Sequence, residues 1–326
     1  MPWRKRSKRN KPTVASSPDL DLNRVMRALG GIPEIRVTRT VEVIPPNPVE
    51  AHALTLANLA VYQSAAGNND KALSIQLEVV ETWRKVAADG SDEHKHYLAG
   101  NLANLGNYLF RQGRKADALA VVEEAAEIHR ELCRSHFAEY ATDFARALSN
   151  LSIHRSFLSR PQEDVLAPLE ESVEIRRKLA ELNPAAHRVD LANSLAVASA
   201  SYLSFGRVSD ATAAAQESVA LSRETGRSDA ASQAILALSL WALAQAQAAG
   251  AGPTRAVQEA LDCAREAAQI YQQLSNGDDP YADHLASVLS MTACALLIKL
   301  NRADEARQIQ GLVGSGAIKE AIAILR

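Results

Sequence analysis

The sequence predicts an all-α protein, an α-solenoid of about six antiparallel helix pairs that follows an N-terminal extension. Three observations lead to this prediction. Apolar residues make up 47% of the 326 residues but aromatic residues only 5%, and this low aromatic content, with Ala and Leu as the main apolar residues, favours helices over sheets. Apolar positions recur three and four residues apart from about residue 49 onward. Finally, nine-residue blocks of similar sequence return at nearly constant spacing, which indicates internal repeats.

The extension begins with a basic segment. Residues 1–16 carry six Lys and Arg side chains within the first 12 positions and no acidic one, which predicts a disordered basic arm. A short helix is expected next, because Ser17-Pro18-Asp19 combines a capping hydroxyl, a first-turn proline and an acid. Its apolar positions have helical spacing and precede Gly30-Gly31; they are Leu22, Val25, Met26 and Leu29.

The period then changes from helical to alternating. Apolar and polar residues alternate over 35–43, which predicts a strand. Three prolines follow by residue 48, so residues 17–48 are expected to hold a short helix, an extended strand and a proline-rich linker. A single strand has unpaired backbone groups; a second copy of the strand in a homodimer, or the edge of a partner, could pair with it.

Internal repeats dominate the rest of the chain. Asn58, Asn104 and Asn150 lie 46 residues apart, and similar blocks begin at five glutamates in steps of 46, 47, 46 and 49 residues. Those glutamates are Glu78, Glu124, Glu171, Glu217 and Glu266. We expect six units within 49–313, at about 51–97, 98–143, 144–190, 191–231, 232–283 and 284–313. Residues 314–326 then predict a closing helix from about Ala317.

Each unit reads as two helices, a helix A and a helix B. The turn between them holds a residue that tolerates the left-handed conformation, namely Gly67, Gly113, Gly206 and Asn301. Ser159 takes this place in the third unit, so that turn is expected to differ. In the second unit, small residues (Gly106, Ala118 and Ala125) predict a close approach of the two helices.

These spacings resemble those of the tetratricopeptide repeat family over about residues 49–313. In the second unit the matching residues are Leu102, Leu105, Gly106, Leu109, Gly113, Ala118, Val122 and Ala125. The 46-residue step and the Asn-Leu pairs resemble the long-helix subtype of kinesin light chains and of many actinobacterial proteins. Two departures are Leu102 at the signature's tryptophan position and Ser152 in place of a glycine. The resemblance implies a right-handed superhelix that binds peptides or proteins in a concave groove, and it implies no chemistry.

Charge and cysteine content restrict the compartment and the partners. The formal net charge is −2, but the residues after 12 carry 30 basic against 38 acidic side chains, a net of −8. The arm could therefore contact nucleic acid, anionic lipid or an acidic protein, or simply be solvated. Three widely spaced cysteines form no disulfide framework, which is typical of a reducing cytoplasm. No apolar run approaches the roughly 20 residues of a membrane helix, so we expect a cytoplasmic protein without membrane contact.

No arrangement of residues predicts catalysis, a metal or a cofactor. The polar run 92–96 lacks an HExxH pattern and is expected to be a solvated loop. The glycines at 311, 314 and 316 lack the spacing of a phosphate-binding loop, and residues 276–280 lack the glutamate that closes a calcium loop. Cys133 and His136 lie three apart at the tail of a helix B, where no catalytic pocket is expected. We therefore expect a protein that is not an enzyme.

The groove is the remaining candidate site. Polar helix A positions that do not face helix B are expected to line it, and they are Asn58, Asn104, Asn107, Arg111, Arg146, Asn150 and Asn193. Asparagine can bind a peptide backbone through both a donor and an acceptor, and arginine suits a carboxylate. The alternative is that these residues bridge neighbouring helices or are only hydrated.

The sequence is compatible with two functions. The first is a scaffold or adaptor that binds a protein or peptide in the groove. The alternative is a regulatory module, in which the basic arm contacts nucleic acid or an acidic partner while the solenoid senses a peptide ligand.

Overall fold

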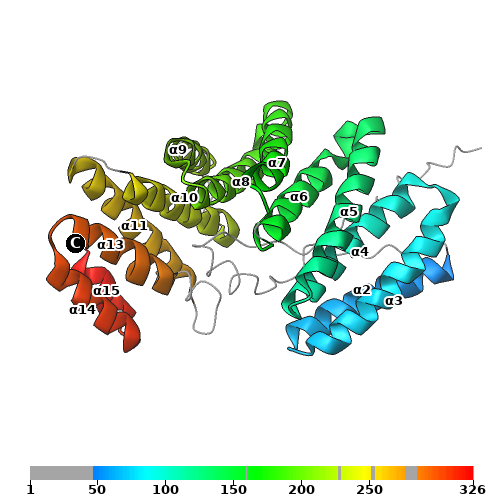
Figure 1. Ribbon diagram of the computed structural model, residues 1–326, viewed down its shortest axis with the longest axis horizontal. Helices are drawn as coiled ribbons and strands as arrows, with labels where there is room; N and C mark the ends of the chain where they lie inside the picture. Colours follow the sequence, from blue (N-terminus) through cyan, green and yellow to red (C-terminus); the bar gives the residue numbers. More distant parts are fainter. Residues whose placement is uncertain (1–46, 159, 227–228, 251–253, 276–284, 326) are drawn as a thin grey trace, which may run out of the picture. The chain divides into compact units, whose positions relative to one another are not determined.

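The computed structural model describes residues 47–158, 160–226, 229–250, 254–275 and 285–325 (Figure 1). Within these ranges every regular element is a helix and no strand occurs, which confirms the all-α class. The basic arm, the expected helix after Ser17 and the expected strand at 35–43 lie outside the described residues. The same is true of Ser159 and of the turn at 276–280.

Among the described residues the chain divides into two units, with the boundary between Tyr140 and Ala141. In the described part of the first unit, consecutive helices pack on one another as two pairs. The pairs are α2 (Pro48–Ala65) with α3 (Asn69–Val86), and α4 (Asp92–Arg111) with α5 (Lys115–Ser135). A short 3-10 helix, η1 (Ala87–Asp89), links them.

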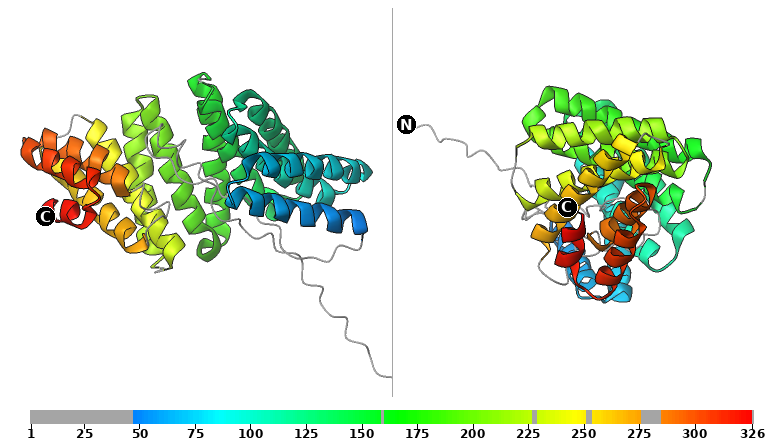
Figure 2. Two further views of the ribbon diagram at one scale, coloured as in Figure 1. Left: turned by 90° about the horizontal axis from the view of Figure 1, so that it is seen from below. Right: turned by 90° about the vertical axis from the view of Figure 1, so that its left-hand side faces the viewer.

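The second unit contributes four further pairs within the described residues. These are α6 (Phe137–Ser156) with α7 (Gln162–Leu182), α8 (Pro184–Ser204) with α9 (Val208–Glu224), α10 (Ala230–Ala249) with α11 (Thr254–Leu274), and η2 (Val288–Ala293) continued by α13 (Cys294–Lys299) with α14 (Ala303–Gly314). Helix α6 begins just before the boundary. Figure 2 shows the helices of each unit lying side by side. The described residues therefore form the six expected pairs.

The expected turns close helix A as predicted. Gly67, Gly113 and Gly206 have φ values of 79°, 77° and 72°, and Asn301 has 59°. After α4, the Arg114 N–H donates to the Leu109 carbonyl and the Gly113 N–H to that of Phe110. These two bonds satisfy carbonyl groups that the end of a helix would otherwise leave unpaired.

One boundary differs from the expectation. The sequence predicts a solvated loop for the polar run 92–96, but this run forms the first turns of α4. Asp92 and Glu93 lie in the first turn, where the helix dipole favours negative charge. The polarity of this run thus reflects a helix N-terminus rather than a linker.

Helices α4 and α5 approach closely because Gly106 has no side chain. A Cβ atom placed on Gly106 would lie 2.5 Å from Cγ2 of Val122 and 3.4 Å from the carbonyl oxygen of Ala118. Val122 and Ala118 are both buried. The predicted packing of small residues in this pair is therefore present.

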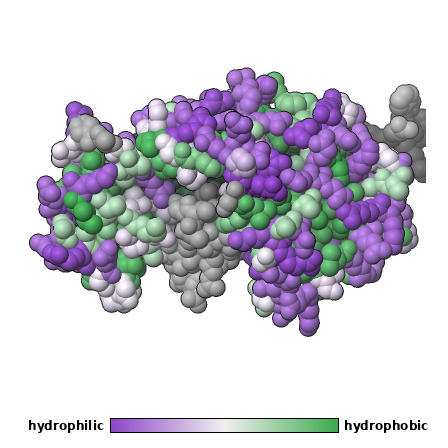
Figure 3. Space-filling view, viewed as in Figure 1, coloured by the Kyte–Doolittle hydropathy of each residue, from purple (hydrophilic) through white to green (hydrophobic). Residues whose placement is uncertain are grey.

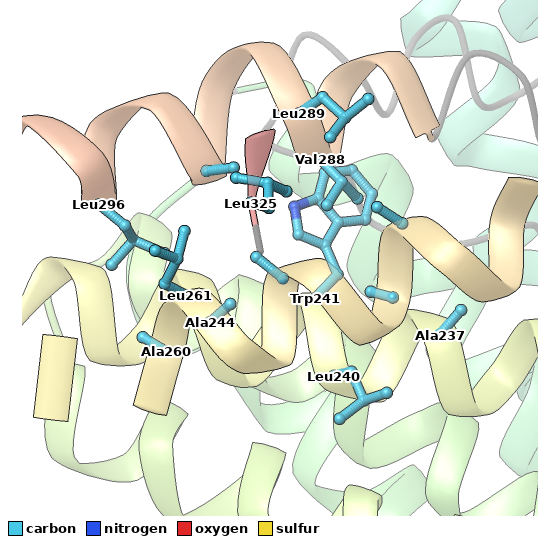
Figure 4. Packing of buried hydrophobic residues seen from close by; sticks show 14 of the residues in the cluster. Ala237, Leu240, Trp241, Ala244, Ala260, Leu261, Val288, Leu289, Leu296 and Leu325 are labelled. Carbon is cyan, nitrogen blue, oxygen red and sulfur yellow. The ribbon is translucent and has the colours of Figure 1, made fainter. Parts of the chain in front are cut away.

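The second unit closes on a large apolar cluster. Figure 4 shows Trp241 of α10 beside Val288 and Leu289 of η2. η2 is a π-helix, and the Trp241 Nε1–H donates to Thr292 Oγ1 across 2.8 Å. The last helix, α15 (Ile318–Ile324), packs on α14 and α11, and Leu325 joins the cluster. The C-terminal end of the array is thus covered by the chain itself.

Two kinds of contact tie the helices together across the pairs. On the B helices, exposed ion pairs join Arg84 to Glu124 (2.5 Å), Arg177 to Glu217 (2.5 Å) and Arg223 to Glu266 (2.8 Å). Buried side chains also join successive pairs: Gln76 Nε2 of α3 donates to the Asn101 carbonyl of α4 across 2.9 Å, and the hydroxyl groups of Ser218 (α9) and Ser239 (α10) lie 2.7 Å apart. The repeated glutamates of the sequence blocks are partners in these ion pairs.

Candidate binding surface on the A helices

The first unit places four of the predicted groove residues on α2 and α4. Asn58 is exposed on α2, whereas Asn104 and Asn107 are buried on α4 and Arg111 is half-buried at its end. Arg111 Nη1 donates to Ser64 Oγ of α2 across 2.9 Å. This bond holds the guanidinium group between two successive A helices.

Asn107 combines burial with an unsatisfied acceptor. Its side chain is 1% exposed, and its Oδ1 atom has no hydrogen-bond partner among the described residues. It lies one helical turn before Arg111, so the two side chains project from one face of α4. A buried acceptor without a partner is unfavourable by about 1–3 kcal/mol, and such groups in proteins are commonly served by water or by a ligand.

The second unit holds the other three predicted residues. Arg146 forms an ion pair with Asp143 one turn earlier on α6, and both side chains are about one quarter exposed. Asn150 of α6 is buried and Asn193 of α8 is half-buried. Ligand contact by these residues, and by those of the first unit, stays a prediction.

The sequence match of Asn58, Asn104 and Asn150 does not give them equal surroundings. Asn104 follows a preceding pair, since α4 packs against α3, whereas no described helix precedes α2. Asn58 is accordingly exposed and Asn104 buried. Within the first unit these two asparagines therefore do not present equivalent surfaces.

A histidine and aromatic cluster near the start of α4 has no counterpart in the sequence-based expectations. His94 Nδ1 lies 2.8 Å from Asp89 Oδ2, and its Nε2 lies 3.4 Å from Glu50 Oε1. Trp83 and Tyr97 stack with ring centroids 4.8 Å apart. The Ser91 backbone N–H and then His94 lower the pKa of Asp89. The cluster thus links α2, α3 and η1 to α4.

A second part of the cluster joins α4 to α5 and to the first turn of α6. The His96 ring lies 5.6 Å from that of His129 and 5.5 Å from that of Tyr140. Among the described residues, no group of three or more His, Cys, Asp and Glu side chains could hold a metal ion. We therefore interpret the cluster as packing between pairs. His94 and His96 belong to the polar run 92–96, and their contacts could be recognised only after this run was placed on α4.

The weaker chemical candidates have ordinary structural positions. Cys133 is buried in the last turns of α5, and His136 contacts Asp92 across 3.3 Å. Burial raises the pKa of Cys263 to about 11, so this thiol is protonated near neutral pH and is a poor nucleophile. Gly311 lies inside α14, where its backbone N–H is part of a helix rather than of a phosphate-binding loop.

The membrane prediction can be tested on the helices alone. None of the helices in the described ranges is long and apolar enough to cross a bilayer. Figure 3 shows a largely hydrophilic face with scattered hydrophobic patches.

Comparison with known proteins supports the repeat interpretation. The family model described as tetratricopeptide repeat matches residues 52–93 and 100–138. These segments cover α2 with α3 and α4 with α5. No curated protein matches the chain in sequence.

Three solved structures share the fold at low sequence identity. BtubC (BKLC) from P. vanneervenii is 19% identical, with a TM-score of 0.54 over 72% of this chain and 85% of that one. A Podosopora anserina protein with nearly identical TPR-like repeats of the kinesin light chain kind is 17% identical, with a TM-score of 0.52 over 72% of this chain and all of that one. The apo form of RapI is 14% identical, with a TM-score of 0.50 over 86% of this chain and 75% of that one.

Proposed function

We propose that this chain, a tetratricopeptide repeat protein, binds an extended segment of a protein partner along its A helices and acts as a non-enzymatic scaffold or adaptor. The observation that carries the proposal is the buried, unsatisfied Oδ1 atom of Asn107, which lies on α4 one helical turn before Arg111. The resemblance to tetratricopeptide repeats supports this surface, because it implies a concave groove lined by helix A positions.

The chemistry of the two side chains suits a peptide. Asn107 Oδ1 can accept a backbone N–H, which every residue of a peptide except proline provides. Arg111 is positioned by Ser64, and a guanidinium group binds a carboxylate through two parallel hydrogen bonds. An extended segment with an acidic side chain or a C-terminal carboxylate is therefore the expected ligand.

A site-specific cross-link tests where the partner binds. Ala103 lies on α4 one turn before Asn107, so a photo-reactive residue at Ala103 should capture the partner in cells. The same residue at Glu123, on the surface of α5, serves as the matched control. Capture from both positions alike would contradict a site on the A helices.

The captured segment then allows a direct measurement. Fluorescence anisotropy with that segment as a synthetic peptide should show binding weakened about tenfold or more in Arg111→Ala and in Asn107→Ala. The control Arg114→Ala, whose side chain pairs with Asp117 at the start of α5, should bind normally. Circular dichroism checks that each variant is folded, and unchanged binding in folded variants would refute the proposal.

The charge distribution favours a second candidate function. Residues 1–12 carry six positive charges, while the rest of the chain has a net charge of −8, so we infer a regulatory module whose arm contacts nucleic acid or an acidic partner. Phosphate contacts weaken steeply as salt rises. DNA retention at low salt, lost at high salt and lost on deleting residues 1–12, would support the nucleic-acid form. No retention of the full chain at low salt would exclude it.

A further inference from the structure

The two ends of the described array are covered differently. At the C-terminal end, α15 packs over the last pair. At the other end, the first helix of the first pair presents large apolar side chains. Leu59 and Tyr62 of α2 are 41% and 69% exposed.

In the second pair, the corresponding face of helix A is buried. Leu105 and Tyr108 occupy the matching positions 46 residues later, and they are only 3% and 2% exposed. They share a face of α4 with Asn101, which accepts hydrogen bonds from Gln76 of α3 at its carbonyl oxygen (2.9 Å) and its Oδ1 (3.1 Å). In α4 this face is therefore covered by the helix B that comes before it.

The first pair lacks such a helix among the described residues. Thr55, which matches Asn101, is exposed like Leu59 and Tyr62. Terminal repeats of an array ordinarily turn a polar face outward, and here the outward face carries a leucine and a tyrosine. Two large apolar side chains that are exposed one turn apart, at positions that are buried in the second pair, indicate a contact with a further segment.

We propose that residues 17–29 form the N-terminal cap of the array by packing on the Thr55–Leu59–Tyr62 face of α2. The sequence of this segment fits the role of a helix B. Leu22, Val25, Met26 and Leu29 give it one apolar stripe, while Arg24 and Arg27 lie on the opposite side. The cap would bury its stripe on α2 and turn a polar face outward.

Chain order and reach agree with this placement. In the second pair, helix B of the preceding pair comes before helix A in the chain, and residues 17–29 likewise precede α2, although with a longer connection. The 17 residues from 30 to 46 span up to about 55 Å when extended, about twice the length of the 18-residue α2. An isolated helix of about 13 residues is only marginally stable in water. Packing on α2 would therefore stabilise residues 17–29 as a helix and would also bury the apolar side chains of α2.

Hydrogen exchange in the full chain tests the contact from both sides. In the variant Val25→Asp with Met26→Asp, amides near Leu59 and Tyr62 should exchange about tenfold faster than in the unmodified chain, because α2 loses its cover. The matched control, Arg24→Asp with Arg27→Asp, adds the same two carboxylates on the polar side and should leave α2 unchanged.

The reciprocal variant distinguishes this cap from other occupants. Leu59→Asp should speed exchange over residues 20–29 by a similar factor. Equal exchange of α2 in the first variant and its control would overturn the proposal. It would also fail if Leu59→Asp left residues 20–29 unchanged. Protection of α2 that rises with protein concentration would assign the face to a second copy instead.

Discussion

Adding one methyl group at Gly106 should destabilise the first unit. The new Cβ atom of Gly106→Ala would lie 2.5 Å from Val122 Cγ2, well inside normal contact. Val122 is buried and, being β-branched, has one strongly preferred rotamer in a helix, so it cannot turn away. Overpacking of this kind costs about 1–3 kcal/mol.

The net effect is smaller because alanine favours helices. Replacing glycine by alanine inside a helix contributes about 0.5–1 kcal/mol of stability, so Gly106→Ala should lower the free energy of unfolding by about 0.5–2 kcal/mol. A methyl group added at Gly100 of the same helix would have no neighbouring atom within 4 Å. Gly100→Ala should therefore raise the free energy of unfolding by about 0.5–1 kcal/mol.

Urea unfolding followed by circular dichroism measures both variants. Val122→Ala in the Gly106→Ala background should relieve the contact, and the double-mutant cycle should give a coupling of about 1 kcal/mol or more. If Gly106→Ala stabilised the chain as Gly100→Ala does, the close approach of α4 and α5 would not depend on the missing side chain, and the argument would be wrong.

Three further predictions concern charge and assembly. Burial lowers the pKa of His154 to about 4, below its unfolded value of about 6.5. As the pH falls, the unfolded chain therefore takes up a proton at His154 before the folded chain does. The free energy of unfolding should fall by about 2 kcal/mol between pH 7 and pH 5. The fall, measured as urea midpoints, should be shallower in His154→Gln, and an identical slope would contradict the assignment. The exposed pair Arg177–Glu217 should show a coupling of at most about 1 kcal/mol in a double-mutant cycle, vanishing near 1 M salt; a larger, salt-insensitive coupling would be inconsistent with solvent screening. If the strand expected at 35–43 pairs in a homodimer, the full chain should sediment as a dimer and a chain starting at Val49 as a monomer, and two monomers would show that self-pairing is wrong.

The fold was predictable because its signals are local and repeated. Each turn needs a residue that tolerates a positive φ, and Gly113 or Asn301 provides it wherever the helical stripe stops. The length of a pair follows from the 46-residue step, since two helices of about 20 residues and two short turns add up to it. The positions of the turns and the length of a pair depend little on tertiary packing, so the residue types at the turns are enough to predict them.

The candidate surface was less predictable because burial depends on neighbours. Asn58 and Asn104 match in sequence, yet one is exposed and the other buried, since only α4 follows another pair. The histidine cluster escapes prediction for a similar reason: His94 and Glu50 are far apart in sequence and meet only through the packing of α4 near α2. The π-helix at η2 has no local signal either, and its Thr292 is matched to Trp241 by tertiary contact.

The two kinds of tie between successive pairs respond differently to solution conditions. In the second unit the ion pair between Arg223 and Glu266 is exposed to solvent, whereas the buried hydroxyl groups of Ser218 (α9) and Ser239 (α10) join two successive pairs away from water. Dissolved ions weaken the former and barely touch the latter. Raising the ionic strength should therefore weaken the contacts between successive B helices of the second unit while the buried contacts between pairs are retained. The curvature of the unit should then change with salt concentration without any pair separating.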